Sequence, residues 1–130
     1  WFGADCHPMM DREDGAWAVD LFEYGKVYDV DFDMDKEQRV RFADSAMNHA
    51  MAFVGVDVED DGKTMRRWRV ENSWGTKIAD KGYFTMSDDW FSQYVYEVAV
   101  PKAMLPEEYL KALDEAPIML PAWDPMGALA

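Results

Sequence analysis

Cysteine and histidine are scarce in this sequence of 130 residues, which contains one cysteine, Cys6, and two histidines, His7 and His49. A single cysteine excludes an internal disulfide bond, and nothing in the chain requires an oxidising compartment, so we expect a cytoplasmic protein. These three residues are also too few ligands, at no familiar spacing, for a zinc site. The sequence therefore predicts no metal.

Basic residues are few as well. There are 13 lysines and arginines against 26 aspartates and glutamates, which gives a formal net charge of -13. A surface of this charge repels a phosphate backbone, so nucleic acid is a poor candidate partner. The basic cluster, Arg66, Arg67 and Arg69, is better explained as surface strand residues or as intersubunit ion pairs.

Long apolar runs are absent. No uninterrupted apolar stretch is long enough to cross a bilayer, and the N-terminus lacks the basic-then-apolar order of a signal peptide. The sequence therefore predicts no membrane partner.

Apolar residues are plentiful even so, at 49% of the chain with 15% aromatic, which is enough for the core of one ordinary domain. We find no internal repeat, low-complexity tract or linker, so one domain or part of one is the simplest organisation. The sequence opens at Trp1 with no initiator methionine and runs straight into strand-like residues. We therefore expect this start to be a cut within a larger protein.

Two helices are predicted from their capping signals. Asp35 and Gln38 have the spacing of a capping box, and apolar residues then recur at helical spacing, which predicts a helix over residues 36–46. Pro106, followed by two glutamates, is a favourable opening for a second helix, which Pro117 ends.

A β-hairpin is predicted between these helices. Residues 50–58 are small, apolar and β-branched, residues 60–62 (Asp-Asp-Gly) form a turn, and residues 65–71 alternate like a returning strand. In an antiparallel pair the start of one strand lies beside the end of the other, so His49 should lie near Asn72.

Further short strands are predicted over residues 82–86 and 94–100, and together they suggest a barrel-like antiparallel sheet. Residues 118–130 are rich in proline and apolar, too irregular for a helix or strand. We expect this segment to be docked against something, because Trp123, Met126 and Leu129 favour burial.

His49 and Asn72 carry the candidate chemistry. In a thiol protease a histidine takes the proton of the cysteine, and an amide oxygen on its other nitrogen fixes the ring and its tautomer. Trp74 could lie over that hydrogen bond and keep water away from it. A core histidine and a turn asparagine are equally ordinary readings, and the chemistry alone leaves both open.

Several longer segments of the sequence match motifs of known proteins. Residues 69–75 (RVENSWG), followed by residues 81–83, resemble the asparagine segment of papain-like cysteine peptidases, and residues 47–51 (MNHAM) resemble their histidine segment. Residues 89–98 and 121–130, with the opening Trp-Phe-Gly, resemble more narrowly the bleomycin hydrolase and bacterial aminopeptidase C family of these peptidases. The resemblance covers essentially the whole chain.

The resemblance implies an α+β, papain-like fold. Residues 1–130 would supply the β-barrel half, with residues 104–130 as the C-terminal helix and active-site arm. The cysteine-bearing N-terminal half, with the glutamine of the oxyanion hole, would be absent from this sequence and would be its natural partner. The resemblance also implies a homohexamer.

The same resemblance implies a cysteine aminopeptidase that acts on peptides without a cofactor. His49 and Asn72 would be the catalytic residues, Trp74 a supporting one, and the carboxylate of Ala130 would bind the substrate amine. A carboxylate in the cleft excludes longer chains, which turns an endopeptidase fold into an aminopeptidase.

Cys6 matches no nucleophile motif and is interpreted as a small hydrophobic filler. We therefore expect the isolated chain to be inactive. The alternative is a non-catalytic module, derived from a truncated protease, that binds peptides or partners. Calcium is not predicted either, because the acidic run Asp31, Asp33 and Asp35 lacks the glycine and the bidentate glutamate of a calcium loop.

Overall fold

A computed structural model describes residues 1–129 of the chain. The strands are β1 (Phe2–Ala4), β2 (Met10–Asp11), β3 (Ala16–Trp17), β4 (His49–Val58), β5 (Met65–Glu71), β6 (Tyr83–Ser87) and β7 (Val95–Val98). The helices are α1 (Tyr24–Tyr28), α2 (Lys36–Arg41), α3 (Asp88–Tyr94) and α4 (Glu107–Asp114), with 3-10 turns η1 (Lys102–Met104) and η2 (Pro125–Leu129). Within the described residues, no helix is both long and apolar enough to cross a membrane.

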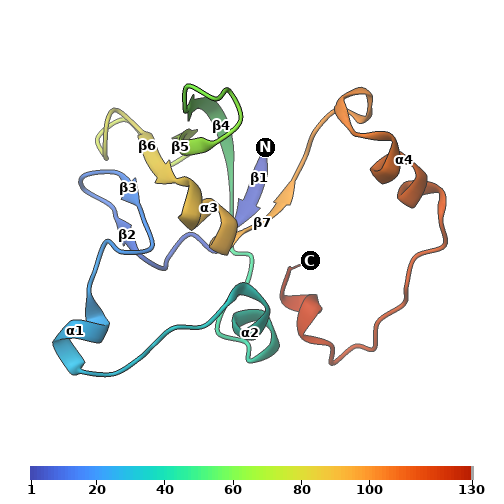
Figure 1. Cartoon of the computed structure of the whole chain (residues 1–130), viewed down its shortest axis with the longest axis horizontal. Helices are drawn as coiled ribbons and strands as arrows, with labels where there is room; N and C mark the ends of the chain where they lie inside the picture. Colours follow the sequence, from blue (N-terminus) through green and yellow to red (C-terminus); the bar gives the residue numbers. More distant parts are fainter. Residues whose placement is uncertain (130) are drawn as a thin grey trace.

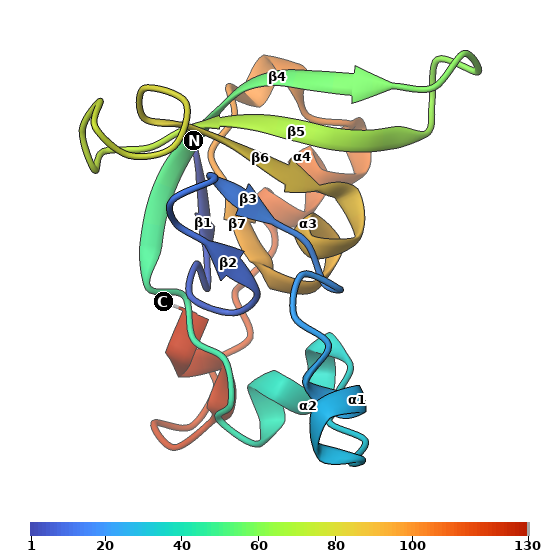
Figure 2. The ribbon, with the colours of Figure 1, turned by 90° about the vertical axis from the view of Figure 1, so that its left-hand side faces the viewer.

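The strands form one sheet in the order β2-β3-β6-β5-β4-β1-β7. Most neighbours are antiparallel, and β3 pairs with β6 in parallel. Figure 2 shows β4, β5 and β6 lying side by side, with the long β4–β5 hairpin projecting beyond the rest. The predicted hairpin is thereby confirmed, and its turn closes through a hydrogen bond from Glu59 N–H to the Thr64 carbonyl, 2.8 Å.

The core is a cluster of aromatic side chains between the sheet and α3. Trp17 packs 4.6 Å from Phe84 and 5.5 Å from Trp90, measured between ring centroids. Both indole N–H groups are satisfied, because Trp17 donates to the Cys6 carbonyl at 3.0 Å and Trp90 donates to the Pro8 carbonyl at 2.9 Å. The chain between β1 and β2 is thus fixed to the core by hydrogen bonds as well as by packing.

β1 lies between β4 and β7 and is buried along its whole length. A Cβ at Gly3 would lie 2.2 Å from the sulfur of Met47, so glycine at the centre of β1 lets the flexible Met47 side chain pack directly against this strand.

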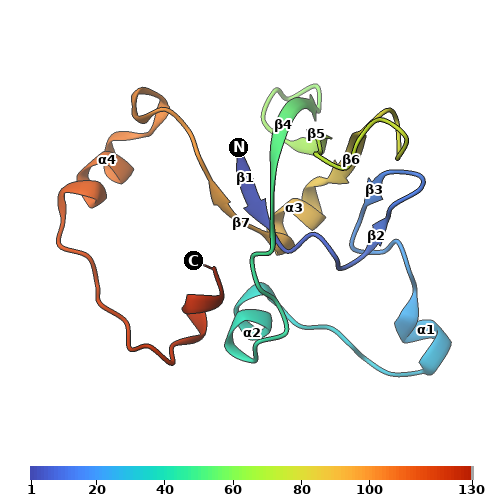
Figure 3. The same ribbon diagram turned by 180° about the vertical axis from the view of Figure 1, so that it is seen from behind.

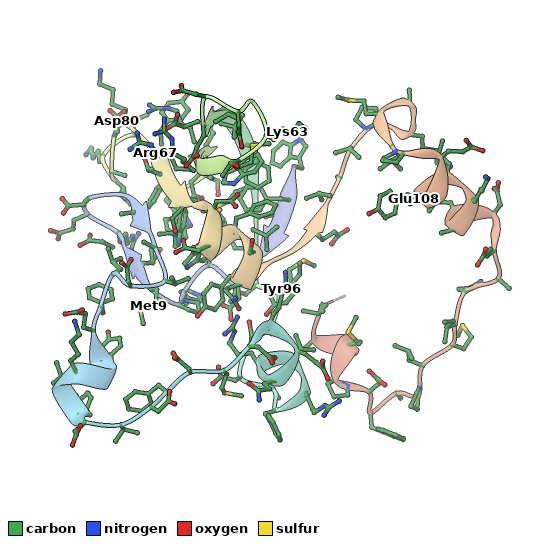
Figure 4. The ribbon with its side chains drawn as sticks, in the orientation of Figure 1. Met9, Lys63, Arg67, Asp80, Tyr96 and Glu108 are labelled. Atoms are coloured by element: carbon green, nitrogen blue, oxygen red, sulfur yellow. The ribbon has the colours of Figure 1, made fainter. Side chains whose placement is uncertain are left out.

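The basic cluster pairs with acids on the surface of the hairpin. Arg66 and Arg67 both bond to Asp57, and Arg69 bonds to Asp80 at 2.8 Å. Hydrogen bonds from Arg67, and to a smaller extent from Arg66, hold the pKa of the Asp57 carboxyl below its usual value. Figure 4 shows Arg67 and Asp80 on this side of the molecule. The interpretation of these arginines as surface strand residues is confirmed, and the ion pairs that they form here lie within the chain.

The predicted helix over residues 36–46 is too long, because α2 ends at Arg41. Its start is as predicted, with Asp35 and Gln38 forming a capping box. Ala43 then adopts φ +57, in the left-handed region, which takes the chain out of the helix. The remaining residues up to β4 form a loop instead.

A helix that the sequence analysis did not predict, α3, precedes β7. Ser87 caps it by accepting from Trp90 N–H, and two aspartates occupy its first turn. The strand predicted over residues 94–100 is shorter as a result, since β7 begins at Val95 and ends at Val98.

After β7 the chain forms an arm that leaves the sheet, passes through α4 and returns toward α2 (Figures 1 and 3). The helix predicted after Pro106 is confirmed as α4. The expected burial of Trp123 and Met126 is wrong, because they are 83% and 51% exposed, and η2 gives part of this segment a helical turn. The arm packs against α2 at η2, and several of its apolar side chains face solvent, among them Met104, Ile118 and Met119.

The aromatic core gives a direct test of the packing. Replacing Phe84, which is fully buried on β6, by alanine should lower the free energy of unfolding by about 3–5 kcal/mol, because a ring-sized cavity forms. The matched control is Thr85→Ala on the exposed face of the same strand, which should change it by about 0.5 kcal/mol or less. Urea denaturation of the protein that carries this chain measures both, and equal losses would contradict the assigned core.

Candidate active site

His49 is placed by two strand neighbours. It is the first residue of β4 and pairs with Ala4 of β1, while β5 lies on the other side of β4. The antiparallel register continues to Ala52 opposite Glu71, so the end of β5 delivers Asn72 to the His49 side chain. The proximity predicted from the hairpin is confirmed.

The two side chains are joined by a hydrogen bond, with His49 Nε2 2.8 Å from Asn72 Oδ1. Ser73 N–H also points at this Asn72 atom, at 2.7 Å. A backbone N–H can only donate, so the atom that it meets must be the amide oxygen, and Nε2 must carry the ring proton. Nδ1 of His49 is then the basic nitrogen, and within residues 1–129 it has no hydrogen-bond partner.

Asn72 is itself held firmly. It is 9% exposed, and its N–H donates to the Gly82 carbonyl at 3.1 Å, which ties it to the start of β6. Gly82 has φ +91, and a Cβ there would lie 3.1 Å from the Gly75 carbonyl oxygen, so the loop closes only with glycine. The amide oxygen therefore meets the imidazole from a fixed backbone.

Trp74 covers the pair, as the sequence analysis expected. Its ring stacks on His49 with a centroid distance of 5.2 Å and an interplanar angle of 19°. Phe84 supports it edge-on at 5.6 Å, and the guanidinium carbon of Arg12 lies 5.3 Å from the indole centroid. An aromatic lid strengthens the hydrogen bond below it by lowering the local dielectric constant.

A groove of about 340 Å³ opens beside His49. Its walls are mostly apolar, with a carboxylate, Glu97, from β7. The lining residues are Trp1, Phe2, Gly3, Met47, Asn48, His49, Ala50, Glu97 and Ala99. The arrangement places a general base, His49, next to an apolar groove that can hold apolar side chains of a peptide.

The far end of the arm is hydrogen-bonded to Met47, a residue that lines this groove. Met47 N–H donates to the Ala128 carbonyl at 3.0 Å, two residues before His49. Ala130, for which we predicted a substrate-binding carboxylate, lies outside the described residues. Leu129 is half-buried.

Cys6 is not placed for catalysis. It is 1% exposed in the aromatic core, and burial, followed by the Asp5 carboxylate, raises the pKa of its thiol to about 11. The interpretation of Cys6 as a hydrophobic filler is confirmed. Within residues 1–129, no three His, Cys, Asp or Glu side chains are grouped to hold a metal ion.

Comparison with known proteins decides the family. The Peptidase C1-like family matches residues 1–127. The chain belongs to this family.

Relatives in the Peptidase C1-like family include aminopeptidase C of Lactobacillus delbrueckii subsp. lactis, 48% identical over 133 residues, and human bleomycin hydrolase, 46% identical over 132 residues. Both alignments cover 100% of this chain and 29% of the relative's length. The crystal structure of PepW from Lactobacillus rhamnosis HN001 superposes with a TM-score of 0.89 at 42% identity, again over 100% of this chain and 29% of the other.

The comparisons confirm two sequence predictions. The resemblance to bleomycin hydrolase and aminopeptidase C holds, with this chain matching the C-terminal part of the relatives, and the α+β papain-like fold holds as well. The chain spans about 29% of the length of the curated relatives that it matches.

Some residues around the site were not predicted. No sequence signal of their own marks these residues. They are Arg12, which lies beside Trp74, and Asp5, Ser45 and Asn48, which precede or face His49. Asp5 meets Ser45 and Asn48 about 40 residues along the chain, and Arg12 meets Trp74 at a still larger separation, which a local pattern does not reveal.

The raised pKa of Cys6 predicts an unreactive thiol. At pH 7.5 the folded protein should leave Cys6 unlabelled by iodoacetamide, because the thiolate is the nucleophile and the protonated form persists to about pH 11. The same protein unfolded in urea at pH 8.5 should be labelled there, which serves as the control. Peptide mass mapping measures both, and rapid native labelling of Cys6 would contradict its burial.

Proposed function

We propose that the intact protein is a cysteine aminopeptidase that removes N-terminal residues from peptides through a thioester acyl-enzyme. The observation that carries the proposal is the hydrogen bond from His49 Nε2 to Asn72 Oδ1, whose direction Ser73 N–H fixes. It leaves Nδ1 available as the base for a thiol nucleophile, with the ring oriented by a third group. The names of the relatives, aminopeptidase C and bleomycin hydrolase, support the reaction class.

In the proposed mechanism the nucleophile comes from the part of the protein outside this sequence. Nδ1 of His49 takes the proton of that cysteine thiol, and the thiolate attacks the first peptide carbonyl of the substrate. The imidazolium then gives the proton to the departing amine as the thioester forms. Water, deprotonated by His49, attacks the thioester and regenerates the thiol.

Asn72 and Trp74 act on His49 rather than on the substrate in this proposal. The amide oxygen holds the ring and remains an acceptor whether the imidazole is neutral or charged. Trp74 excludes water from that bond by stacking over the ring. No cofactor enters any step.

The arm supplies the aminopeptidase character. The Ala128 carbonyl is bonded to the N–H of Met47, a residue that lines the groove beside His49, which supports a role for the arm at this groove. We propose that the carboxylate of Ala130 pairs with the α-ammonium of the substrate and blocks longer chains. A cytoplasmic homohexamer completes the proposal.

The alternative function is a non-catalytic peptide- or partner-binding module. The groove of about 340 Å³ favours peptide binding in either case. The two functions separate on the presence of a cysteine upstream, since Cys6 is buried and unsuited to attack. We propose that the chain alone is inactive.

The role of His49 is tested by histidine replacement in the intact protein. His49→Ala should lower kcat for an aminoacyl substrate by about a thousandfold or more, because both proton transfers lose their carrier. The control is His7→Ala, which removes the other histidine, an exposed residue. Near-normal turnover of the His49 variant would remove it from the mechanism.

The role of the chain end is tested by truncation. Deleting Leu129 and Ala130 should shift the products from single N-terminal residues toward internal fragments, because the carboxylate that excludes longer peptides is displaced. Leu129→Ala at full length keeps the carboxylate and serves as the control. Mass spectrometry of a digested peptide reads the products, and an unchanged aminopeptidase pattern in the truncated protein would refute the anchoring role.

A further inference from the structure

A network of polar side chains, of which Asp5 and Ser45 are buried and Asn48 is exposed, lies immediately before His49 and has no part in the mechanism above. Its centre is Asp5, which follows β1 and is 6% exposed. One carboxylate oxygen accepts from Ser45 Oγ at 2.8 Å, and the other accepts from Asn48 Nδ2 at 2.6 Å. A carboxylate so far from water is costly unless its hydrogen bonds are satisfied, and both oxygens here are.

Asn48 is hydrogen-bonded to the last residue of β1, Ala4, and to the two residues that follow it, Asp5 and Cys6. Its side-chain oxygen accepts from Cys6 N–H at 3.0 Å, and its own N–H donates to the Ala4 carbonyl at 3.0 Å. With the Asp5 contact, Asn48 therefore touches three successive residues of one strand end. His49 is the next residue, so these bonds hold the segment that leads into it.

The network continues to a third element. Tyr96 on β7 donates from its hydroxyl to Ser45 Oγ at 2.7 Å, and its ring lies 4.9 Å from the ammonium of Lys36 on α2. Figure 4 shows Tyr96 at the base of β7, facing α2. The donors point one way, from Tyr96 to Ser45 to Asp5, so the chain ends on the carboxylate as its final acceptor.

The segment held by this network carries two functional groups. Ser45 and Asn48 anchor the two ends of this segment, residues 45–48, to Asp5. Within the segment, Met47 N–H donates to the Ala128 carbonyl of the arm. His49 follows directly. One buried carboxylate thus fixes both the base and the arm's docking residue against the same strand.

We propose that Asp5 is a positioning residue, and that its pairing with Asn48 sets the place of His49 and of the arm relative to the sheet. The proposal rests on the proposed peptidase function for its kinetic readout. It does not rest on that function for its structural readout. A carboxylate facing an amide is a directional pair, so the two residues can be exchanged.

The exchange gives the test. In the intact protein Asp5→Asn turns an amide nitrogen or a poorer acceptor toward Asn48, and Asn48→Asp sets two carboxylates against each other. The double variant Asp5→Asn, Asn48→Asp can restore all three hydrogen bonds. Its amide at position 5 donates to the carboxylate at position 48 and accepts from Ser45, and that carboxylate accepts from Cys6 N–H. Each single variant should lower kcat about tenfold to a hundredfold with little change in KM, and the double variant should recover most of it.

The control is Asp44→Asn, which removes an exposed carboxylate from the same loop and should leave kcat unchanged. Asn48→Asp places a carboxylate next to His49 and can shift the pH dependence of kcat. The kcat of each variant is therefore measured at its own optimum pH, so that this shift is not mistaken for a misplaced His49 side chain. Thermal melting of every variant reports folding. Single variants that lose stability but keep kcat, or a folded double variant that stays as slow as the singles, would overturn the proposal.

Crystal structures of the variants separate this proposal from the proposed function. The distance from His49 Nε2 to Asn72 Oδ1, 2.8 Å in this structure, should lengthen in the single variants and return in the double variant. If the wild-type protein cleaves no peptide yet the distance follows this pattern, the peptidase function fails and the positioning role stands. If His49 is unmoved in the folded single variants, the positioning role fails.

Discussion

The hydrogen bond between His49 and Asn72 depends on the antiparallel register of β4 and β5, and the rest of the site follows from it. The register brings the first residue of one strand to the end of the other, and Gly82 lets the following loop close over Asn72. Because Ser73 N–H claims the same amide oxygen, the ring has one tautomer. The basic nitrogen is therefore Nδ1, which has no hydrogen-bond partner within residues 1–129.

Under the proposed function, the chain supplies one side of a two-sided active site. It would provide the proton carrier, its orienting amide, the covering indole and the arm, since its own thiol is buried in the core. The arm exposes Trp123 and Ile118, and the chain covers 29% of the length of the relatives that it matches. The sheet carries its own core of Trp17, Phe84 and Trp90.

The elements defined by local signals could be predicted. The alternation of residues 65–71, the turn before them and the capping box at Asp35 determined the hairpin and the start of α2. The predictions that failed concern features that no local sequence pattern marks. The end of α2 is set by a left-handed Ala43, and Asp5 finds Ser45 and Asn48 about 40 residues away. The α3 helix is short, and its stability comes from the buried Trp90 rather than from a long helical period.

Neutron diffraction from crystals of the intact protein, exchanged into heavy water, tests the central claim most directly because it locates the ring deuterium of His49. The structure predicts a deuterium on Nε2, aimed at Asn72 Oδ1, and a cysteine sulfur from the remainder of the protein facing Nδ1. A deuterium-free Nε2, or an Asn72 amide that presents its nitrogen to the ring, would contradict the proposed proton carrier.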